Sequence, residues 1–290
     1  MKHRYSILSI VLLLLLSVST AFASVSYLGP AGTYTEEATL LFFGDKEQIV
    51  PVTTVAEAVK MVKEGQSNYA VVPVENTIGG PVYNYLDAVV NDKDFVVIGE
   101  INLPIRQTLI VVPETKLTDI KTVMSHPQGL AQSKDWLKAN LPEAKLVEVP
   151  STAEAAKRVA QAGDKSIAAI AASRTAKVYN LDILANDLQY TDTNVTRFWV
   201  VTTKKQQTFG QQKFIIVAQG SAQALPKLLS DLDRKGFKLI SLHDRPAKTR
   251  LGEYVYVIEM SGSNVPLLQD VVAKHTRDLN TRVVGVFDAK

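Results

Sequence analysis

The chain has 290 residues, 32 Lys and Arg against 29 Asp and Glu, a formal net charge of +3, and no cysteine. This length suffices for one or two domains with cores of their own, while the absence of cysteine excludes disulfides, thiolate metal sites and a cysteine nucleophile. A charge balance this close to neutral gives no support to a nucleic-acid or anionic-membrane partner.

The first 23 residues predict a cleavable secretory signal peptide. Basic residues at positions 2–4 precede an apolar run over 7–16, and Ala21-Phe22-Ala23 forms a small-x-small cleavage site. The run is shorter than the roughly 20 apolar residues that span a bilayer. The alternative is an uncleaved anchor. We expect cleavage, and therefore export to the periplasm or secretion, with no membrane contact by the mature chain.

Between residues 24 and 203, short β-rich runs alternate with stretches of helical spacing. Strands are expected over 25–28, 49–52, 69–74, 95–101, 108–112, 122–124, 145–149, 167–171 and 198–202, and helices over 34–43, 55–64, 82–90, 130–139 and 153–161. Thr54 and Ser151 are N-cap candidates. The alternation predicts an α/β fold with largely parallel sheets.

A polar stretch then interrupts the alternation, and residues 204–212 are expected to be a linker. Residues 213–290 form a tail in which the order strand, helix, strand, strand, helix, strand is expected. This is the order of a ferredoxin-like sandwich. The sequence thus predicts a signal peptide (1–23), a first domain (24–203), a linker (204–212) and a second domain (213–290).

Several common catalytic motifs are missing. The three histidines after the signal peptide, His126, His243 and His275, lack metal-binding spacing, and neither GxSxG nor GxGxxG occurs. We therefore expect no metal and no cofactor. Chemistry must come from hydroxyls, amides, carboxylates and arginine.

Four polar segments follow expected strands or precede helices, where α/β proteins place their binding sites. In the first, over residues 29–38 (GPAGTYTEEA), Thr33 or Thr35 is expected to cap the next helix, whose N-terminal amides attract an anion. An ordinary capped turn is the alternative.

The second segment, over residues 72–82, ends a buried strand with Glu75, Asn76 and Thr77. Asn76 and Thr77 are candidates to bind a substrate carboxylate, and Glu75 to position its neighbours. An Asn-containing turn with self-satisfied side chains is the alternative.

The third segment, over residues 125–132 (SHPQGLAQ), offers Ser125 and two glutamines, Gln128 and Gln132, which are four residues apart and share a helix face. Two amides and a hydroxyl at a helix start suit a carboxylate. His126 is a conceivable general base, but beside Pro127 we expect it to serve the turn.

The fourth segment, over residues 194–201, contains Thr196 and Arg197. Arg197 can pair with a substrate carboxylate or with a structural acid. A fixed Thr196 hydroxyl in a dry site can donate its proton to a leaving group. A strand-edge threonine and a salt-bridged arginine are the alternative.

GPAGTYTEEA, VPVENTIGG, SHPQGLAQ and NVTRF, in this order and followed by the tail, resemble the prephenate dehydratase family over residues 25–287. The resemblance implies a catalytic domain with two α/β lobes, similar to periplasmic binding proteins, and an active site in the cleft between them. It also implies a cofactor-free lyase that converts prephenate to phenylpyruvate in phenylalanine biosynthesis, losing water and carbon dioxide.

The same resemblance implies roles for individual residues. Thr196 assists departure of the ring hydroxyl, with Glu75 and Asn76 beside it. The implied substrate contacts are Thr33, Thr77, Ser125, Gln128, Gln132 and Arg197.

The tail resembles an ACT domain, which in this family binds phenylalanine at a dimer interface; a homodimer is therefore implied. Two ligand motifs depart from the family pattern, reading Gln223-Ala224-Leu225 and His243-Asp244-Arg245-Pro246. The family pattern is kept at Ala224, Leu225, Arg245 and Pro246. At Gln223, however, glutamine replaces a glycine that lets the ligand approach the backbone. We expect the fold to be kept and phenylalanine feedback to be lost, as suits an enzyme exported away from cytoplasmic phenylalanine.

Three alternatives stay open at this point. The substrate could be the related arogenate; the chain could be an exported solute-binding protein of the same shape; or the tail could act as a dimeric sensor. Retention of Thr196 together with the third segment favours an enzyme, and the altered tail motifs weigh against a sensor.

Overall fold

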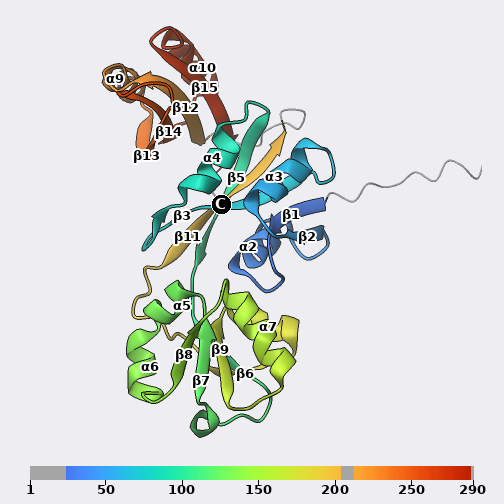
Figure 1. Ribbon diagram of the computed structural model, residues 1–290. Coiled ribbons are helices and arrows are strands. Elements are labelled where there is room, and N and C mark those ends of the chain that lie inside the picture. Colours follow the sequence, from blue (N-terminus) through green and yellow to red (C-terminus); the bar gives the residue numbers. More distant parts are fainter. Residues whose placement is uncertain (1–23, 204–211, 289–290) are drawn as a thin grey trace, which may run out of the picture.

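The computed structural model describes residues 24–203 and 212–288. The expected signal peptide and all of the expected linker except residue 212 lie outside the described residues. Figure 1 shows three bodies in a row, with lobe I (residues 24–104 and 195–203) between lobe II (105–194) and the tail (213–288). Within the described part of the chain, no helix is long and apolar enough to cross a membrane.

Lobe I is built on a mixed sheet in the order β5-β11-β3-β1-β2. Its strands are β1 (Ser24–Leu28), β2 (Gln48–Val52), β3 (Tyr69–Asn76), β4 (Gly80–Pro81), β5 (Phe95–Pro104) and β11 (Val195–Thr203), and its helices are α2 (Tyr34–Phe43), α3 (Val55–Lys63) and α4 (Tyr83–Val90). Side chains alternate along β3, so Val71 packs toward α2 while Val72 and Val74 pack toward α3 and α4.

Lobe II has a separate five-stranded sheet in the order β10-β6-β9-β7-β8. Its elements are β6 (Thr108–Val111), a 3-10 turn (Leu117–Asp119), β7 (Thr122–Ser125), α5 (Pro127–Gln132), α6 (Lys134–Asn140), β8 (Lys145–Glu148), α7 (Thr152–Ala162), β9 (Ile167–Ala171), α8 (Ser173–Tyr179) and β10 (Asp182–Ala185). The chain crosses between the lobes twice, over residues 105–107 and 186–194. This is the two-lobed α/β architecture that the resemblance implied.

The tail has the expected order β12 (Lys213–Ser221), α9 (Leu225–Arg234), β13 (Lys238–Pro246), β14 (Glu253–Ser261), α10 (Val265–Lys274) and β15 (Leu279–Phe287). One face of its sheet packs against its own helices. The other face joins the core of lobe I, where Ile215 and Val257 lie in one cluster with Trp199. Gly285 on β15 pairs with Val97 on β5, so ten strands form one continuous sheet through lobe I and tail.

Two predictions of local structure need correction, and several short elements were not predicted. The sheets are mixed rather than largely parallel. The strand that follows each crossing segment runs antiparallel to its neighbours, as β11 does between β3 and β5. The single helix expected over 130–139 is two helices, α5 and α6, divided at Ser133. The short elements β4, α8 and β10 were not predicted. For α8, the N-cap residue forms no side-chain cap, so the sequence carries no start signal for this helix.

Candidate active site

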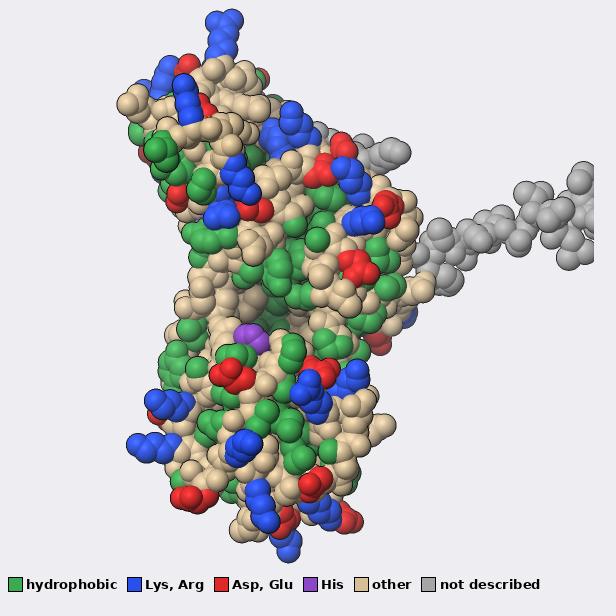
Figure 2. All heavy atoms as spheres, in the orientation of Figure 1, with side chains coloured by type: hydrophobic (Ala, Val, Ile, Leu, Met, Phe, Trp, Pro, Cys, Tyr) green, Lys and Arg blue, Asp and Glu red, His purple; other side chains and the backbone are tan. Residues whose placement is uncertain are grey.

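A cavity of about 220 Å³ lies between lobe I and lobe II. Figure 2 shows that the molecule narrows between these lobes. Most charged side chains on the face shown lie above or below this narrow part. The described residues that line the cavity are Thr33, Tyr34, Thr35, Pro73, Asn76, Ile105, Gln107, His126, Gln128, Gly129, Gln132, Pro150, Ser151, Thr152, Asn194, Thr196 and Phe198. None of them is Asp, Glu, Lys or Arg, so the polar part of this lining consists of amides, hydroxyls and one imidazole.

The register of β3 and β11 brings Asn76 and Thr196 together as direct partners. The Asn76 Oδ1 accepts hydrogen bonds from the backbone N–H groups of Ile78 (3.0 Å) and Gly79 (2.9 Å). Because the oxygen is thereby identified, the other terminal atom of the amide must be the nitrogen, which can only donate.

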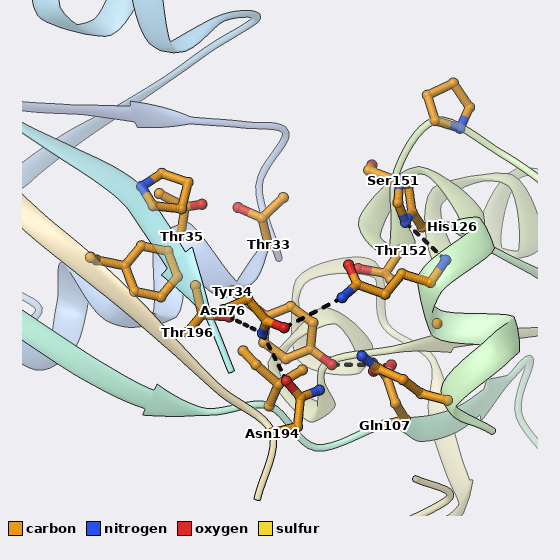
Figure 3. Close-up of a pocket in the computed structure, with 17 residues that line it drawn as sticks. Thr33, Tyr34, Thr35, Asn76, Gln107, His126, Ser151, Thr152, Asn194 and Thr196 are labelled. Carbon is orange, nitrogen blue, oxygen red and sulfur yellow. Dashed lines mark hydrogen bonds between the residues drawn. The ribbon is translucent and has the colours of Figure 1, made fainter. Parts of the chain in front are cut away.

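The Asn76 Nδ2 donates to Asn194 Oδ1 at 2.7 Å and to Thr196 Oγ1 at 2.9 Å. Figure 3 shows Asn76 between these two side chains. Since the Thr196 oxygen accepts, its own proton is left for another acceptor, and none is found among the described residues. The arrangement therefore presents Thr196 as a hydrogen-bond donor at the cavity wall.

The lobe II side of the cavity carries three glutamine amides. Gln107 Nε2 donates to Gln132 Oε1 at 2.8 Å, which leaves the Gln132 nitrogen as a donor. The Tyr34 hydroxyl from lobe I lies 2.7 Å from the Arg106 carbonyl and 3.2 Å from Gln107 Oε1, and burial raises its pKa. Gln128 Nε2 reaches across the cavity to within 3.5 Å of Asn76 Oδ1.

Helices α2 and α7 begin at the cavity, with Thr33 and Ser151 as their N-caps. The positive ends of two helices therefore favour negative charge in this space. The Thr33 hydroxyl is itself occupied: it accepts from Glu36 N–H at 3.3 Å and donates to the Leu28 carbonyl at 3.1 Å. Thr54 also caps its helix as predicted.

His126 caps α5: its Nδ1 accepts from the Gln128 N–H at 3.2 Å, which is the turn role expected for it. No group of three or more His, Asp or Glu residues in the described part of the chain is placed to hold a metal ion.

Glu75 and Arg197 do not line the cavity. They follow the alternation of the strands, so each lies on the face opposite its neighbour Asn76 or Thr196. There Arg197 Nη1 lies 2.5 Å from Glu259 Oε2 of the tail and 3.4 Å from Glu75 Oε2. The geometry matches the structural alternative for Arg197 rather than a substrate contact.

Ser125 and Thr77 are also outside the lining. The Ser125 hydroxyl is fully buried in lobe II and donates to the Ile170 carbonyl at 2.7 Å. Thr77 Oγ1 donates to the Thr193 carbonyl at 2.7 Å and accepts from the Val195 N–H at 2.9 Å, which secures the second crossing segment to lobe I. Both hydroxyls are thus satisfied by backbone groups.

The four tail residues singled out in the sequence divide between two places. Ala224 precedes α9 and Leu225 begins it, where both pack against the tail core. Arg245, next to Pro246 at the end of β13, forms a two-point ion pair with Asp87 of α4 at 3.1 and 3.0 Å and lies 4.4 Å from the centre of the Tyr83 ring. Arg245 is therefore engaged by lobe I.

Sequence reasoning missed four polar residues of the site: Tyr34, Gln107, Thr152 and Asn194. Tyr34 and Asn194 lie inside the first and fourth polar segments but were given no role. Gln107 lies in the first crossing segment, where the one available signal was a polar residue ahead of the apolar run over 108–112.

Comparison with known proteins gives consistent matches over most of the chain. A family model described as Prephenate dehydratase matches residues 25–206. The prephenate dehydratase of Amycolatopsis methanolica is 33% identical over 270 residues, covering 91% of this chain and 88% of that protein. A solved prephenate dehydratase from Arthrobacter aurescens, in complex with L-Phe, has a TM-score of 0.83 at 30% identity and covers 92% of this chain and 90% of its own.

The bifunctional chorismate mutase/prephenate dehydratase of Neisseria gonorrhoeae is 34% identical over 241 residues, or 82% of this chain. The chain spans about two thirds, 66%, of the length of that relative.

Proposed function

Because the chain belongs to the prephenate dehydratase family, we propose that it catalyses the decarboxylating dehydration of prephenate to phenylpyruvate. In this reaction the electron pair of the bond between the ring and its carboxylate moves into the ring, and the ring C–O bond breaks with its electrons on oxygen. Carbon dioxide and hydroxide leave, and the hydroxide becomes water on gaining a proton. The change is redox-neutral and needs no electron acceptor.

The observation that carries the proposal is the hydrogen bond from Asn76 Nδ2 to Thr196 Oγ1 at 2.9 Å. It leaves the Thr196 proton free to be donated to the departing ring oxygen, where negative charge develops. A positioned proton donor of this kind contributes about 10²- to 10⁴-fold to a rate. Asn76 is itself held by two backbone N–H groups, so the donor is oriented before the substrate binds.

The remaining lining suits a substrate with two carboxylates. Gln128 and Gln132 supply amide donors, and the N-terminal ends of α2 and α7 add favourable potential. No acidic side chain among the lining residues repels the substrate. The same absence favours prephenate over arogenate, because the ammonium group of arogenate has no carboxylate partner in this lining.

The proposal extends to the tail and to location. The βαββαβ order supports an ACT-like domain, with a homodimer as the assembly that the family resemblance implies. Phenylalanine is proposed as a weak effector at most, because Gln223, His243 and Asp244 depart from the ligand motifs and Arg245 is paired with Asp87. The signal-like sequence of residues 1–23 supports export to the periplasm or secretion.

The experiment is to incubate purified protein lacking residues 1–23 with prephenate and to follow phenylpyruvate, with arogenate in a parallel assay. We expect turnover of prephenate, little turnover of arogenate, and a loss of about 10²-fold or more in kcat for Thr196→Ala, with partial activity in Thr196→Ser. Tight binding of prephenate without product would instead support the solute-binding alternative and overturn the enzyme.

A further inference from the structure

The two strands that carry Asn76 and Thr196 present a second pair of polar residues on their opposite face. In the register of β3 and β11, Thr196 lies beside Asn76 and Arg197 lies beside Glu75. The pairing becomes irregular immediately after Arg197, where Phe198 pairs with Pro73 and Val74 is skipped. The backbone ladder between these strands is therefore interrupted next to Thr196, and side-chain contacts must help to define its position.

Arg197 is held from behind by the tail. Its Nη1 lies 2.5 Å from Oε2 of Glu259, a residue of β14 that is only 4% exposed. This carboxylate is the one hydrogen-bond acceptor of the guanidinium within the described residues, and the Glu75 carboxylate lies farther away at 3.4 Å. The Arg197 Nε is buried without a partner in the same part of the chain. Glu259 is thus the principal anchor of Arg197.

The surroundings make this anchor hard to replace. Three carboxylates, Glu75, Glu100 and Glu259, lie with Arg197 and Lys213 in one cluster, where Lys213 is paired with Glu100. Burial raises the pKa of Glu259, while Arg197 acts in the opposite direction. Removing the Glu259 charge leaves a largely buried guanidinium without the carboxylate nearest to it, which is strongly unfavourable and favours a reorientation of Arg197.

We propose that Glu259 is a positioning residue for Thr196, acting through Arg197, and that the tail is for this reason part of the catalytic apparatus. Arg197 directly follows Thr196 on β11, so a shift of the arginine moves the hydroxyl relative to Asn76 and to the substrate. The inference rests on the proposed function of Thr196 as the donor to the leaving oxygen. A displacement of about 1 Å at such a position costs up to 10²-fold in rate.

An ion pair between tail and lobe I that lies outside this cluster provides a matched control. Arg245 of β13 pairs with Asp87 of α4 at 3.1 and 3.0 Å, and neither residue forms a hydrogen bond or ion pair with Arg197 within the described residues. Glu259→Gln and Asp87→Asn each replace one carboxylate with an amide of nearly the same shape. Both weaken the attachment of the tail, and only the first releases Arg197.

The experiment compares the full chain with both variants in steady-state kinetics on prephenate. We expect Glu259→Gln to lower kcat by about tenfold or more with KM within about threefold of wild type, and Asp87→Asn to keep kcat within about twofold. Glu259→Asp retains the charge on a shorter side chain and should lose less than Glu259→Gln. An unchanged kcat in Glu259→Gln, or an equal loss in Asp87→Asn, would overturn the inference. If Glu259→Gln does not fold, Glu259→Asp decides by the same comparison.

A spectroscopic readout separates this inference from the proposed function. The methyl resonance of Thr196, assigned through Thr196→Ser, should shift in Glu259→Gln and stay in place in Asp87→Asn. Failure of wild-type protein to convert prephenate would refute the proposed function while leaving this positional test intact. An unmoved methyl resonance in a folded Glu259→Gln protein would refute the positioning role alone.

Discussion

The Asn76 side-chain nitrogen donates to the Thr196 hydroxyl oxygen at 2.9 Å, and the direction of this bond decides what the threonine can do. It is fixed because Asn76 Oδ1 already accepts from two backbone N–H groups. A threonine that accepts from its neighbour keeps its own proton for the cavity. A threonine that had to donate to its neighbour would have none to offer.

Reversing that bond should abolish most of the activity. In Asn76→Asp, one carboxylate oxygen can still accept from Ile78 and Gly79, but the other replaces the donor and accepts the Thr196 proton. We expect kcat to fall by about 10²-fold or more. Steady-state kinetics on prephenate check this, and circular dichroism confirms folding. A well-folded aspartate variant with near wild-type kcat would contradict the assigned bond direction.

Ser125 should affect stability rather than substrate binding. Its buried hydroxyl donates to the Ile170 carbonyl at 2.7 Å. The serine oxygen also packs closely against Gly129, where an added Cβ would come within 2.5 Å of it. Ser125→Ala removes this buried hydrogen bond and should cost about 1 kcal/mol of unfolding free energy. KM for prephenate should stay within about twofold of wild type. A large rise in KM at unchanged stability would restore Ser125 as a substrate contact.

The sequence predicted the secondary structure and the four polar segments well, but not which member of each segment faces the cavity. Glu75 and Asn76 are adjacent on a strand, so alternation allows only one of them to point into the cleft. Both are polar, and nothing in their order identifies which. Arg197 could likewise be interpreted as a ligand because its partner, Glu259, lies 62 residues farther along the chain.

Contacts between distant segments account for the other differences. Gln107 enters the site through its bond to Gln132 and its proximity to Tyr34, which joins three segments far apart in sequence. The Ser125 hydroxyl donates to the Ile170 carbonyl of the neighbouring strand β9, and this bond sets its direction. Such partners are set by strand order and register, which the local pattern of apolar residues does not specify.

Glu36 should stabilise the contact between the two lobes. It is 4% exposed; its Oε2 accepts from the Gly32 N–H at 2.6 Å and the Tyr27 hydroxyl at 3.0 Å, while its Oε1 accepts from Arg174 of lobe II at 3.0 Å. Glu36→Gln removes the charge and part of this accepting capacity. We expect the free energy of unfolding to fall by about 2 kcal/mol. This is less than for a fully buried pair, because Arg174 is partly exposed.

Chemical denaturation measures the loss, and Glu37→Gln on the same helix serves as the control. Burial raises the pKa of Glu37 and outweighs the opposing effect of Arg174, so its neutralisation should leave stability nearly unchanged or slightly improved. Equal effects of the two substitutions would rule out a specific role of Glu36 in this contact.

His243 should make the protein less stable as the solution becomes acidic. Burial lowers its pKa below the usual value, and Arg197 acts in the same direction, whereas Glu75, at 3.9 Å, and Asp244 oppose the shift. The unfolded chain therefore binds a proton at His243 more readily than the folded one. The stabilisation from a neutral His243 is complete above its unfolded pKa of about 6.5 and is lost as the pH falls through the lower folded pKa.

Replacing His243 with glutamine should remove this contribution. Unfolding free energies measured at about pH 7.5 and pH 5 should fall more steeply for wild type than for His243→Gln, with a difference in slope of at most about 1.4 kcal/mol per pH unit. A His243→Gln protein whose stability declines as steeply as wild type would show that another group carries the acid sensitivity.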